Sequence, residues 1–172
     1  MNRRLATTLA TIALLTAATP AVAADAGGSD VRTAVATARR STEKYHDVAA
    51  AVADGYVRVS DCVSAPGLGA MGIHYLNPAL AADPRIDAAK PELLLYAPSA
   101  GRLRLVGVEY FRADADQDLT TDGDRPNLAG VPFDGPMPGH DVAMPIHYDL
   151  HVWAWQANPA GTFSEFNPNV HC

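Results

Sequence analysis

Apolar residues recur at three- and four-residue steps between Val31 and Val52. This spacing places them along one side of an α-helix and leaves the charged residues mainly on the other side. Ser29-Asp30 before the pattern and Asp54-Gly55 after it are typical of residues that begin and end a helix. The pattern therefore predicts one long N-terminal amphipathic helix that packs on the rest of the domain.

After this helix the pattern changes to the two-residue alternation of β-strands. Residues 56–60 and 73–76 are short candidates, and the glycine-rich segment 66–72 between them predicts a tight loop. The clearest signal is a hairpin with strands at 92–96 and 102–111. These segments predict strands that pair in an antiparallel sheet.

The rest of the chain predicts a long connection and one more strand. Residues 112–145 are rich in Asp, Gly and Pro, and a connection of this length is usually functional or disordered. Residues 146–156 alternate again as a strand. We therefore expect an α+β fold, in which the long helix packs on an antiparallel sheet of four or five strands that could curl into an open barrel.

The last strand separates two unlike faces. One face is apolar and predicts core packing: Ile146, Tyr148, Leu150, Val152 and Ala154. The other face carries two imidazoles, a carboxylate and two indoles: His147, Asp149, His151, Trp153 and Trp155. Aromatic side chains with a few polar groups among them are typical of a ligand pocket. We expect Asp149, Trp153 and Trp155 to line such a pocket, together with Tyr75.

The histidines on this face suggest a metal site. His147 and His151 stand four residues apart, about 13 Å along a strand, which is too far for both to bind one metal comfortably. Glu109 supplies a further ligand, because it shares a strand face with the apolar Leu105 and a buried carboxylate needs a partner. His74, Glu109 and either His147 or His151 would give the nitrogen and oxygen set that zinc, copper or another divalent transition metal accepts. Alternatively, His74 and Glu109 form a structural pair, or Glu109 lies at an exposed edge.

Other groups are weaker candidates. We expect His46 to be solvated and His140 to lie at the tip of the long loop, and we rank His171 as a third-choice ligand. The acidic run at 114–124 lacks the glycine and glutamate of an EF-hand loop at the required positions, so we expect a solvated loop. None of the motifs of the common secreted hydrolases is present, and no catalytic residue is assigned.

Composition adds the size of the protein and its compartment. A chain of 172 residues with 48% apolar content fits one globular domain. Its net charge of −6 argues against nucleic-acid binding, because a protein that binds nucleic acid requires a basic face. Residues 1–23 have the cationic start, short apolar run and small-residue exit of a secretory signal peptide. We expect cleavage after Ala23, which changes the charge to −8 and leaves a single secreted, soluble domain at 24–172 with no membrane segment.

Export also decides how the two cysteines are interpreted. In an oxidising compartment, Cys62 and Cys172 predict a disulfide that holds the C-terminus against the segment after the first helix. A free thiol, or a metal-binding pair of His171 and Cys172, is the alternative.

Four segments of this chain resemble a group of small exported proteins of actinobacteria: 69–78, 91–98, 105–110 and 151–159. The resemblance implies export and carries no activity, cofactor or catalytic residue. Two functional hypotheses follow from the residues themselves. The first is a secreted divalent-metal protein, with or without enzymatic activity. The second is a metal-free domain that binds a small apolar or sugar-like ligand, and a structural or interaction role is a third possibility.

Overall fold

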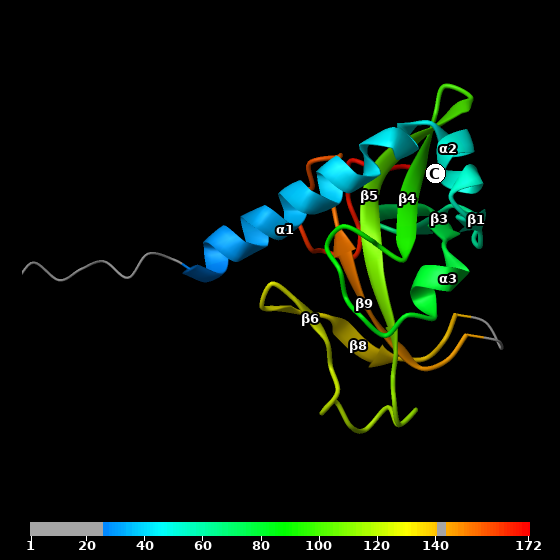
Figure 1. The fold of residues 1–172 in the computed structure, drawn as a ribbon. Coiled ribbons are helices and arrows are strands. Elements are labelled where there is room, and N and C mark those ends of the chain that lie inside the picture. Colours follow the sequence, from blue (N-terminus) through cyan, green and yellow to red (C-terminus); the bar gives the residue numbers. More distant parts are fainter. Residues whose placement is uncertain (1–25, 141–143) are drawn as a thin grey trace, which may run out of the picture.

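The computed structural model describes residues 26–140 and 144–172, so the predicted signal peptide lies outside the described residues (Figure 1). The N-terminal region consists of α1 (Ala26–Thr42), a 3₁₀ turn η1 (Glu43–His46) and α2 (Val48–Ala53). The prediction of one long helix up to Val52 is therefore not confirmed. The break has a local cause: Asp47 is extended (φ −89°, ψ 110°), and its side chain caps α2 by accepting a hydrogen bond from the Ala49 amide at 2.9 Å.

Only part of α1 packs on the domain. Ala34 and Ala38 are buried in the core, and Tyr45 of η1 joins them. The first turns of α1 extend beyond the sheet (Figure 1). Tyr45 lies two residues before the break at Asp47, and its ring packs edge-on against that of Tyr56, with ring centroids 5.2 Å apart. The apolar period thus continues from α1 through η1 to Ala51 of α2, because Tyr45 and Ala51 reach the same core.

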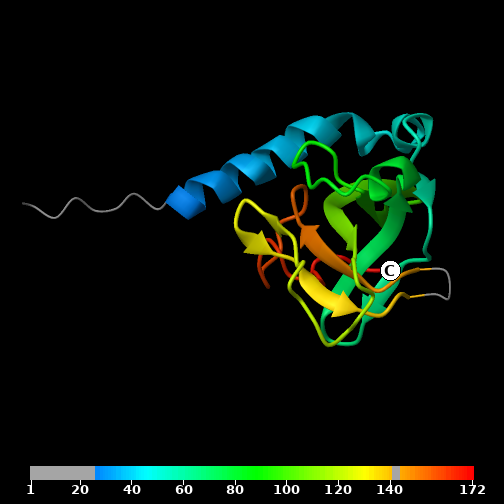
Figure 2. The same cartoon turned by 60° about the horizontal axis from the view of Figure 1, so that its bottom comes forward.

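Seven strands form one antiparallel sheet, more than the four or five that the pattern predicts. Their bounds are β1 Val57–Arg58, β2 Val63–Ala65, β3 Gly69–Leu76, β4 Leu93–Ser99, β5 Arg102–Ala113, β8 Asp134–Met137 and β9 His147–Val152. The order is β1-β3-β4-β5-β9-β8, with β2 paired to β3 beyond this path. The sheet is open, with β1 and β8 at its edges (Figures 1 and 2).

The connections differ from the prediction in two places. The glycine-rich segment is partly strand, because β3 already begins at Gly69. Gly72 has φ +98°, and a Cβ there would lie 2.5 Å from the Tyr96 carbonyl oxygen, so glycine lets β3 approach β4 closely. The long connection contains β8 and a small ladder of β6 (Asn127–Leu128) with β7 (Val131–Pro132). A short helix, α3 (Pro78–Ala81), follows β3, and the predicted hairpin is present as β4 and β5.

The two faces of the sheet carry different kinds of side chain. The predicted core side chains Tyr148, Leu150 and Val152 of β9 pack with Ala34 and Ala38 of α1 in the main core. The opposite face holds the histidines and acidic side chains, together with a second apolar cluster that includes Leu95, Val106 and Val170. The N-terminal helices α1 and α2 thus pack on one face, and the histidines and acidic side chains lie on the other.

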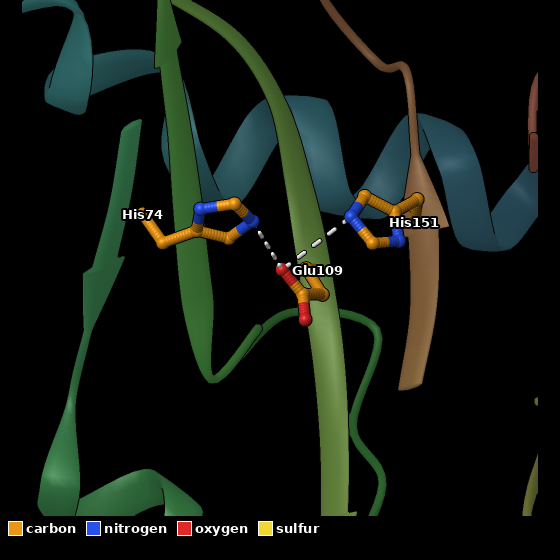
Figure 3. Close-up of side chains that lie close together, drawn as sticks. All are labelled: His74, Glu109 and His151. Carbon is orange, nitrogen blue, oxygen red and sulfur yellow. Dashed lines mark ion pairs between the residues drawn. The ribbon is translucent and has the colours of Figure 1, made fainter. Parts of the chain in front are cut away.

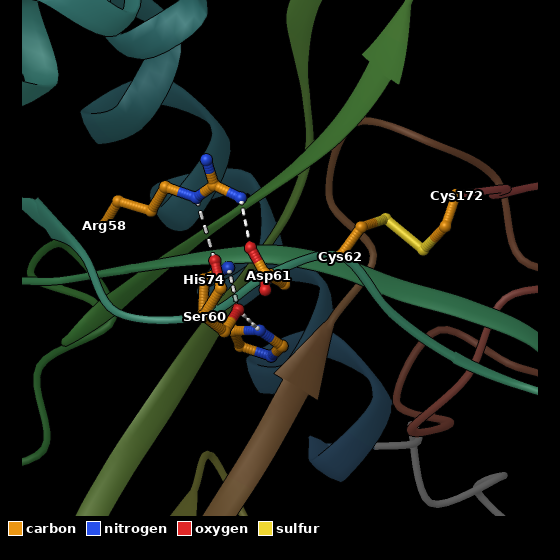
Figure 4. The surroundings of a disulfide bond; sticks show 6 residues. All are labelled: Arg58, Ser60, Asp61, Cys62, His74 and Cys172. Carbon is orange, nitrogen blue, oxygen red and sulfur yellow. Dashed lines mark hydrogen bonds and ion pairs between the residues drawn. A yellow bond between two sulfur atoms is a disulfide. The ribbon is translucent and has the colours of Figure 1, made fainter.

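Cys62 and Cys172 form the predicted disulfide, with Cα atoms 5.6 Å apart (Figure 4). The bond joins the end of the chain to the segment between β1 and β2, 110 residues earlier in the sequence. Among the described residues, no helix is both long enough and apolar enough to cross a bilayer.

Candidate metal centre

His74, Glu109 and His151 come together on the face of the sheet opposite α1, from β3, β5 and β9 (Figure 3). Glu109 and His151 are register partners on neighbouring strands. His74 lies on β3, which is separated from β5 by β4, and its side chain points across β4 towards Glu109. Glu109 Oε2 lies 3.3 Å from His74 Nε2 and 3.6 Å from His151 Nε2. All three potential ligand atoms lie within 4.8 Å of one another, so the group could hold a metal ion.

These three side chains are buried but poorly satisfied. His74, Glu109 and His151 are 9%, 4% and 1% exposed. Within residues 26–140 and 144–172, Glu109 Oε2 and both ring nitrogens of His151 have no hydrogen-bond partner. A buried polar atom without a partner costs roughly 1–3 kcal/mol, and most such atoms in proteins are paired. The three unsatisfied atoms therefore mark a place where a further group would stabilise the protein.

Burial also determines the charge of the cluster. It lowers the pKa of His74 to about 4 and that of His151 to about 3, and the nearby His140 adds to both shifts. Burial raises the pKa of Glu109 well above its usual range, with further contributions from Asp149, Glu92 and Glu165. Both imidazoles are thus neutral at pH 7, which is the form that binds metal ions. A cation that binds here would require Glu109 in its carboxylate form, which burial disfavours in the metal-free protein.

The outer nitrogens of both imidazoles face groups that can orient them. Ser60 Oγ lies 2.9 Å from His74 Nδ1 and also accepts a hydrogen bond from the His74 amide at 2.9 Å (Figure 4). Asp149 Oδ1 lies 3.8 Å from His151 Nδ1. Metal-bound histidines usually donate from their second nitrogen to such oxygen atoms, which fixes the ring and its tautomer. Ser60 occupies such a position, whereas Asp149 Oδ1 lies on the correct side of His151 but is too far for a direct hydrogen bond.

The cluster lies in the wall of a cavity of about 800 Å³. Asp149, Glu165 and His140 also line this cavity, but most of its wall is apolar. The apolar side chains come from the strands, from α3 and from the C-terminal segment, and include Val59, Val63, Met71, Leu76, Leu93, Phe111 and Phe166. Cavities of this size and character are typical of small-molecule sites.

The structure selects His151 over His147 as the partner of Glu109. His147 pairs with Ala113 at the other end of β9, and its ring stacks on Phe111 with centroids 5.2 Å apart. Its Nδ1 lies 3.1 Å from the Pro145 carbonyl oxygen, and its Nε2 lies 3.9 Å from Asp149 Oδ2. His147 thus lies beside Asp149 and outside the group of three.

Three of the four residues predicted to line the pocket lie elsewhere. Trp153 packs in the second apolar cluster, and Trp155 packs at the helices, where its ring contacts His46 with centroids 4.3 Å apart. Neither indole lines the cavity: Trp153 shares the histidine face but packs with Leu95 and Val106, and Trp155 lies beyond the end of β9 at Val152. Tyr75 lies in the main core, because its neighbour His74 takes the cavity face. Asp149 does line the cavity.

The side of β5 on which Glu109 lies also differs in part from the prediction. Leu105 belongs to the main core, whereas Glu109 faces the cavity. The pairing of β4 with β5 shifts register between Leu95 and Tyr96, so that Val106 has no partner in the ladder. This bulge changes which side chains share a face, and a single sequence gives little sign of it.

The weaker candidates are placed as follows. His46 and His171 are exposed. His140 is exposed but also lines the cavity, with its ring centroid 5.5 Å from that of His147. In the acidic run, backbone amides and threonine hydroxyls bind several carboxylates; for example, Asp118 N donates to Asp114 Oδ2 at 3.0 Å.

Sequence reasoning missed Ser60 and the apolar wall. Ser60 stands in a two-residue alternation that predicts an ordinary strand, and nothing in the sequence places it against a residue 14 positions later. The wall residues of α3 and the C-terminal segment carry no signal of their own, because they meet only in the folded chain. Comparisons with known protein families, with curated proteins and with solved structures find no match.

Proposed function

We propose that this protein binds a divalent transition metal ion through His74 Nε2, Glu109 Oε2 and His151 Nε2, with zinc as the first assignment. The observation that carries the proposal is the convergence of unsatisfied, buried ligand atoms: Glu109 Oε2 and His151 Nε2 lack partners among the described residues, and His74 Nε2 faces them at 3.3 Å from Glu109. A metal ion would satisfy all three at once.

The alternative is a structural cluster held by hydrogen bonds, and the geometry favours it less. Hydrogen bonds between nitrogen and oxygen have lengths of about 2.7–3.2 Å. The distances from Glu109 Oε2 to His74 and His151 are 3.3 and 3.6 Å, and each is longer than that range. In a hydrogen-bonded cluster the oxygen and nitrogen atoms would lie closer together, whereas atoms that bind the same metal ion must leave space for it between them.

The ligand set leaves room for another ligand. Three protein ligands of nitrogen and oxygen, with a fourth position free, are typical of zinc sites that act on or bind a molecule, whereas structural zinc sites have four protein ligands. Here the free position would face the cavity, because His74, Glu109 and His151 all line it. We assign no reaction. Copper accepts imidazole nitrogens too, and metal content decides between the two.

The test is a zinc competition titration of protein prepared without a histidine tag. We expect one zinc ion per chain, and we expect His151→Ala to weaken binding by more than about 100-fold, because even the loss of an outer-shell partner costs 10–100-fold. His171→Ala is the matched control, since His171 is exposed and lies outside the cluster. Equal affinities of the two variants, or wild-type protein that binds no zinc, would overturn the proposal.

A metal-free binding domain is the second candidate, and the cavity of about 800 Å³ with its apolar wall favours it. The two candidates differ in one respect: ligand binding would be independent of metal in the second. We further propose a small-molecule ligand and no nucleic-acid partner, in line with the net charge of −6.

Export of the protein is part of the same proposal. The disulfide between Cys62 and Cys172 supports maturation in an oxidising compartment, and the N-terminal 23 residues have the composition of a signal peptide. The four segments that resemble small exported bacterial proteins support the same compartment. Mass spectrometry of protein from the culture medium should give a chain that begins at Ala24 and has no free thiol. Intact chain in the cytoplasm with two reactive thiols would overturn this part.

A further inference from the structure

The cavity is far larger than a metal ion and its water ligands require. Its volume is about 800 Å³, whereas one water molecule occupies about 30 Å³ in the liquid. Small-molecule sites in proteins have volumes of about 300–1,000 Å³. The space beside the three ligands is therefore that of a site for a whole organic molecule.

The wall favours a ligand with an apolar body. Val59, Val63 and Met71 line the cavity from the β1–β3 side, and Phe111 and Phe166 line it from β5 and the C-terminal segment. A sugar would require several hydrogen-bonding side chains around it. Beyond the three proposed ligands, the polar side chains of the lining are Ser60, Asp149, Glu165 and His140, and two of these already face the outer nitrogens of the metal-binding histidines.

The charge of the loaded centre favours an anionic head group. A divalent ion with one carboxylate and two neutral imidazoles carries one net positive charge. Glu109 is 4% exposed, so this charge would lie in surroundings where an uncompensated ion is costly. Asp149 and Glu165 also line the cavity, but both lie outside the group of three, and Asp149 Oδ1 faces His151 Nδ1 and not the metal-binding Nε2, so neither acid takes the free position on the ion.

From these observations, and resting on the proposed metal centre, we infer that the cavity binds a small amphiphilic monoanion. Its head group, such as a carboxylate, would take the free position on the metal ion, and its hydrocarbon body would pack along the wall formed by Val59, Val63 and Met71. The shared chemistry of the ligand class is one oxygen anion joined to an apolar chain or ring.

The test uses octanoate as the probe and the zinc-loaded protein, after its zinc content has been measured. Acetate has the same head group without the body, 1-octanol has the body without the charge, and octylamine has the body with the opposite charge. Calorimetry gives the affinities, and the visible spectrum of the cobalt-substituted protein reports whether the head group enters the coordination sphere. We expect octanoate to bind at least about tenfold more tightly than acetate, since burial of only two methylene groups is worth that factor. We also expect it to bind at least about tenfold more tightly than 1-octanol and octylamine, since neither supplies an anion to the positively charged metal centre.

Two matched variants test the place of the hydrocarbon body. Val59 and Val57 are 51% and 48% exposed, and only Val59 lines the cavity. Val59→Glu should weaken octanoate binding by about tenfold or more without loss of zinc, since a carboxylate at the wall disrupts the apolar contact. Val57→Glu adds the same charge two residues away and should leave the affinity unchanged.

The outcomes separate this inference from the proposal on which it rests. Full zinc loading together with octanoate binding no tighter than that of acetate or octanol would overturn the inference and leave the metal centre intact. Octanoate binding that is equally strong without metal, or an unchanged cobalt spectrum, would also overturn it. Absence of zinc binding would overturn both.

Discussion

Replacement of Glu109 by glutamine separates a metal ligand from a structural partner. Glutamine keeps the shape of the side chain, but it cannot supply the negative charge that a divalent ion requires. Glu109 is 4% exposed, and its Oε2 lacks a hydrogen-bond partner among the described residues. In the metal-free protein the buried carboxyl group therefore destabilises the folded state, and burial raises its pKa well above the usual range. We expect Glu109→Gln to leave the metal-free protein at least as stable as wild type at pH 8.

The effect with metal should have the opposite sign. A ligand that binds only the folded state at 100 times its dissociation constant stabilises it by about 2.7 kcal/mol. For a chain of this length, each kcal/mol changes the melting temperature by about 2–4 °C, so zinc should raise that of wild type by roughly 5–10 °C. We expect Glu109→Gln to lose nearly all of this increase, because the site loses its carboxylate.

The assay is thermal unfolding followed by circular dichroism, with and without zinc, at pH 8. Glu165→Gln is the control, because Glu165 lines the same cavity but lies outside the group of three. It should keep the zinc-dependent increase. If Glu109→Gln instead destabilises the metal-free protein by more than about 1 kcal/mol and wild type shows no response to zinc, the cluster is structural and the reasoning fails.

Three further predictions concern Ser60, the disulfide and Glu92. Ser60→Ala should weaken zinc binding by about 10–100-fold, because the group that orients His74 is lost. Ser64→Ala, at an exposed position in β2, should leave zinc binding unchanged, and a competition titration compares the two variants. Cys172→Ser should lower the free energy of unfolding by about 4–5 kcal/mol in urea titrations, because the disulfide closes a loop of about a hundred residues, and an unchanged urea midpoint would contradict this. Burial raises the pKa of Glu92 to about 7 from its usual 4.5, so the folded state binds more protons than the unfolded state between these values, and stability falls as pH rises through them. Glu92→Gln should remove this slope and make the variant more stable than wild type at pH 8 by roughly 3 kcal/mol, and parallel pH profiles of the two proteins would refute it.

The alternation of side chains could be predicted from the sequence wherever a strand continues. His147, Asp149 and His151 share a face, and Tyr148, Leu150 and Val152 share the other, because successive side chains of a strand point to opposite sides. The rule still holds for Trp153, which lies on the histidine face in the second apolar cluster, but it fails for Trp155, which packs against the main core. After Val152 the chain turns, and the Trp153 amide donates to the Thr162 carbonyl at 2.9 Å instead of continuing the ladder.

The site required information that one sequence lacks. The residue types at His74 and Glu109 suggest either a metal site or a structural pair, and the choice between His147 and His151 depends on register. Glu109 pairs with His151, whereas His147 lies opposite Ala113. A shift of the pairing would exchange their roles, and local residue preferences do not set it.

The helix break shows a similar limit. An unbroken apolar period predicts one helix, yet Asp47 ends the first helical region and caps the next. Asp side chains compete for backbone amides and favour such positions, but the same residue type is also common on the solvated side of a helix. Here Asp47 takes the capping role, because its side chain accepts a hydrogen bond from the Ala49 amide.

The central claim is that His74, Glu109 and His151 hold one metal ion, and X-ray absorption spectroscopy of the zinc-loaded protein tests it most directly. The account predicts one zinc ion per chain with two imidazole nitrogens and a carboxylate oxygen in its first shell, and loss of this spectrum in Glu109→Gln. A zinc ion that keeps its spectrum in that variant, or a first shell that contains sulfur or a single imidazole, would contradict it.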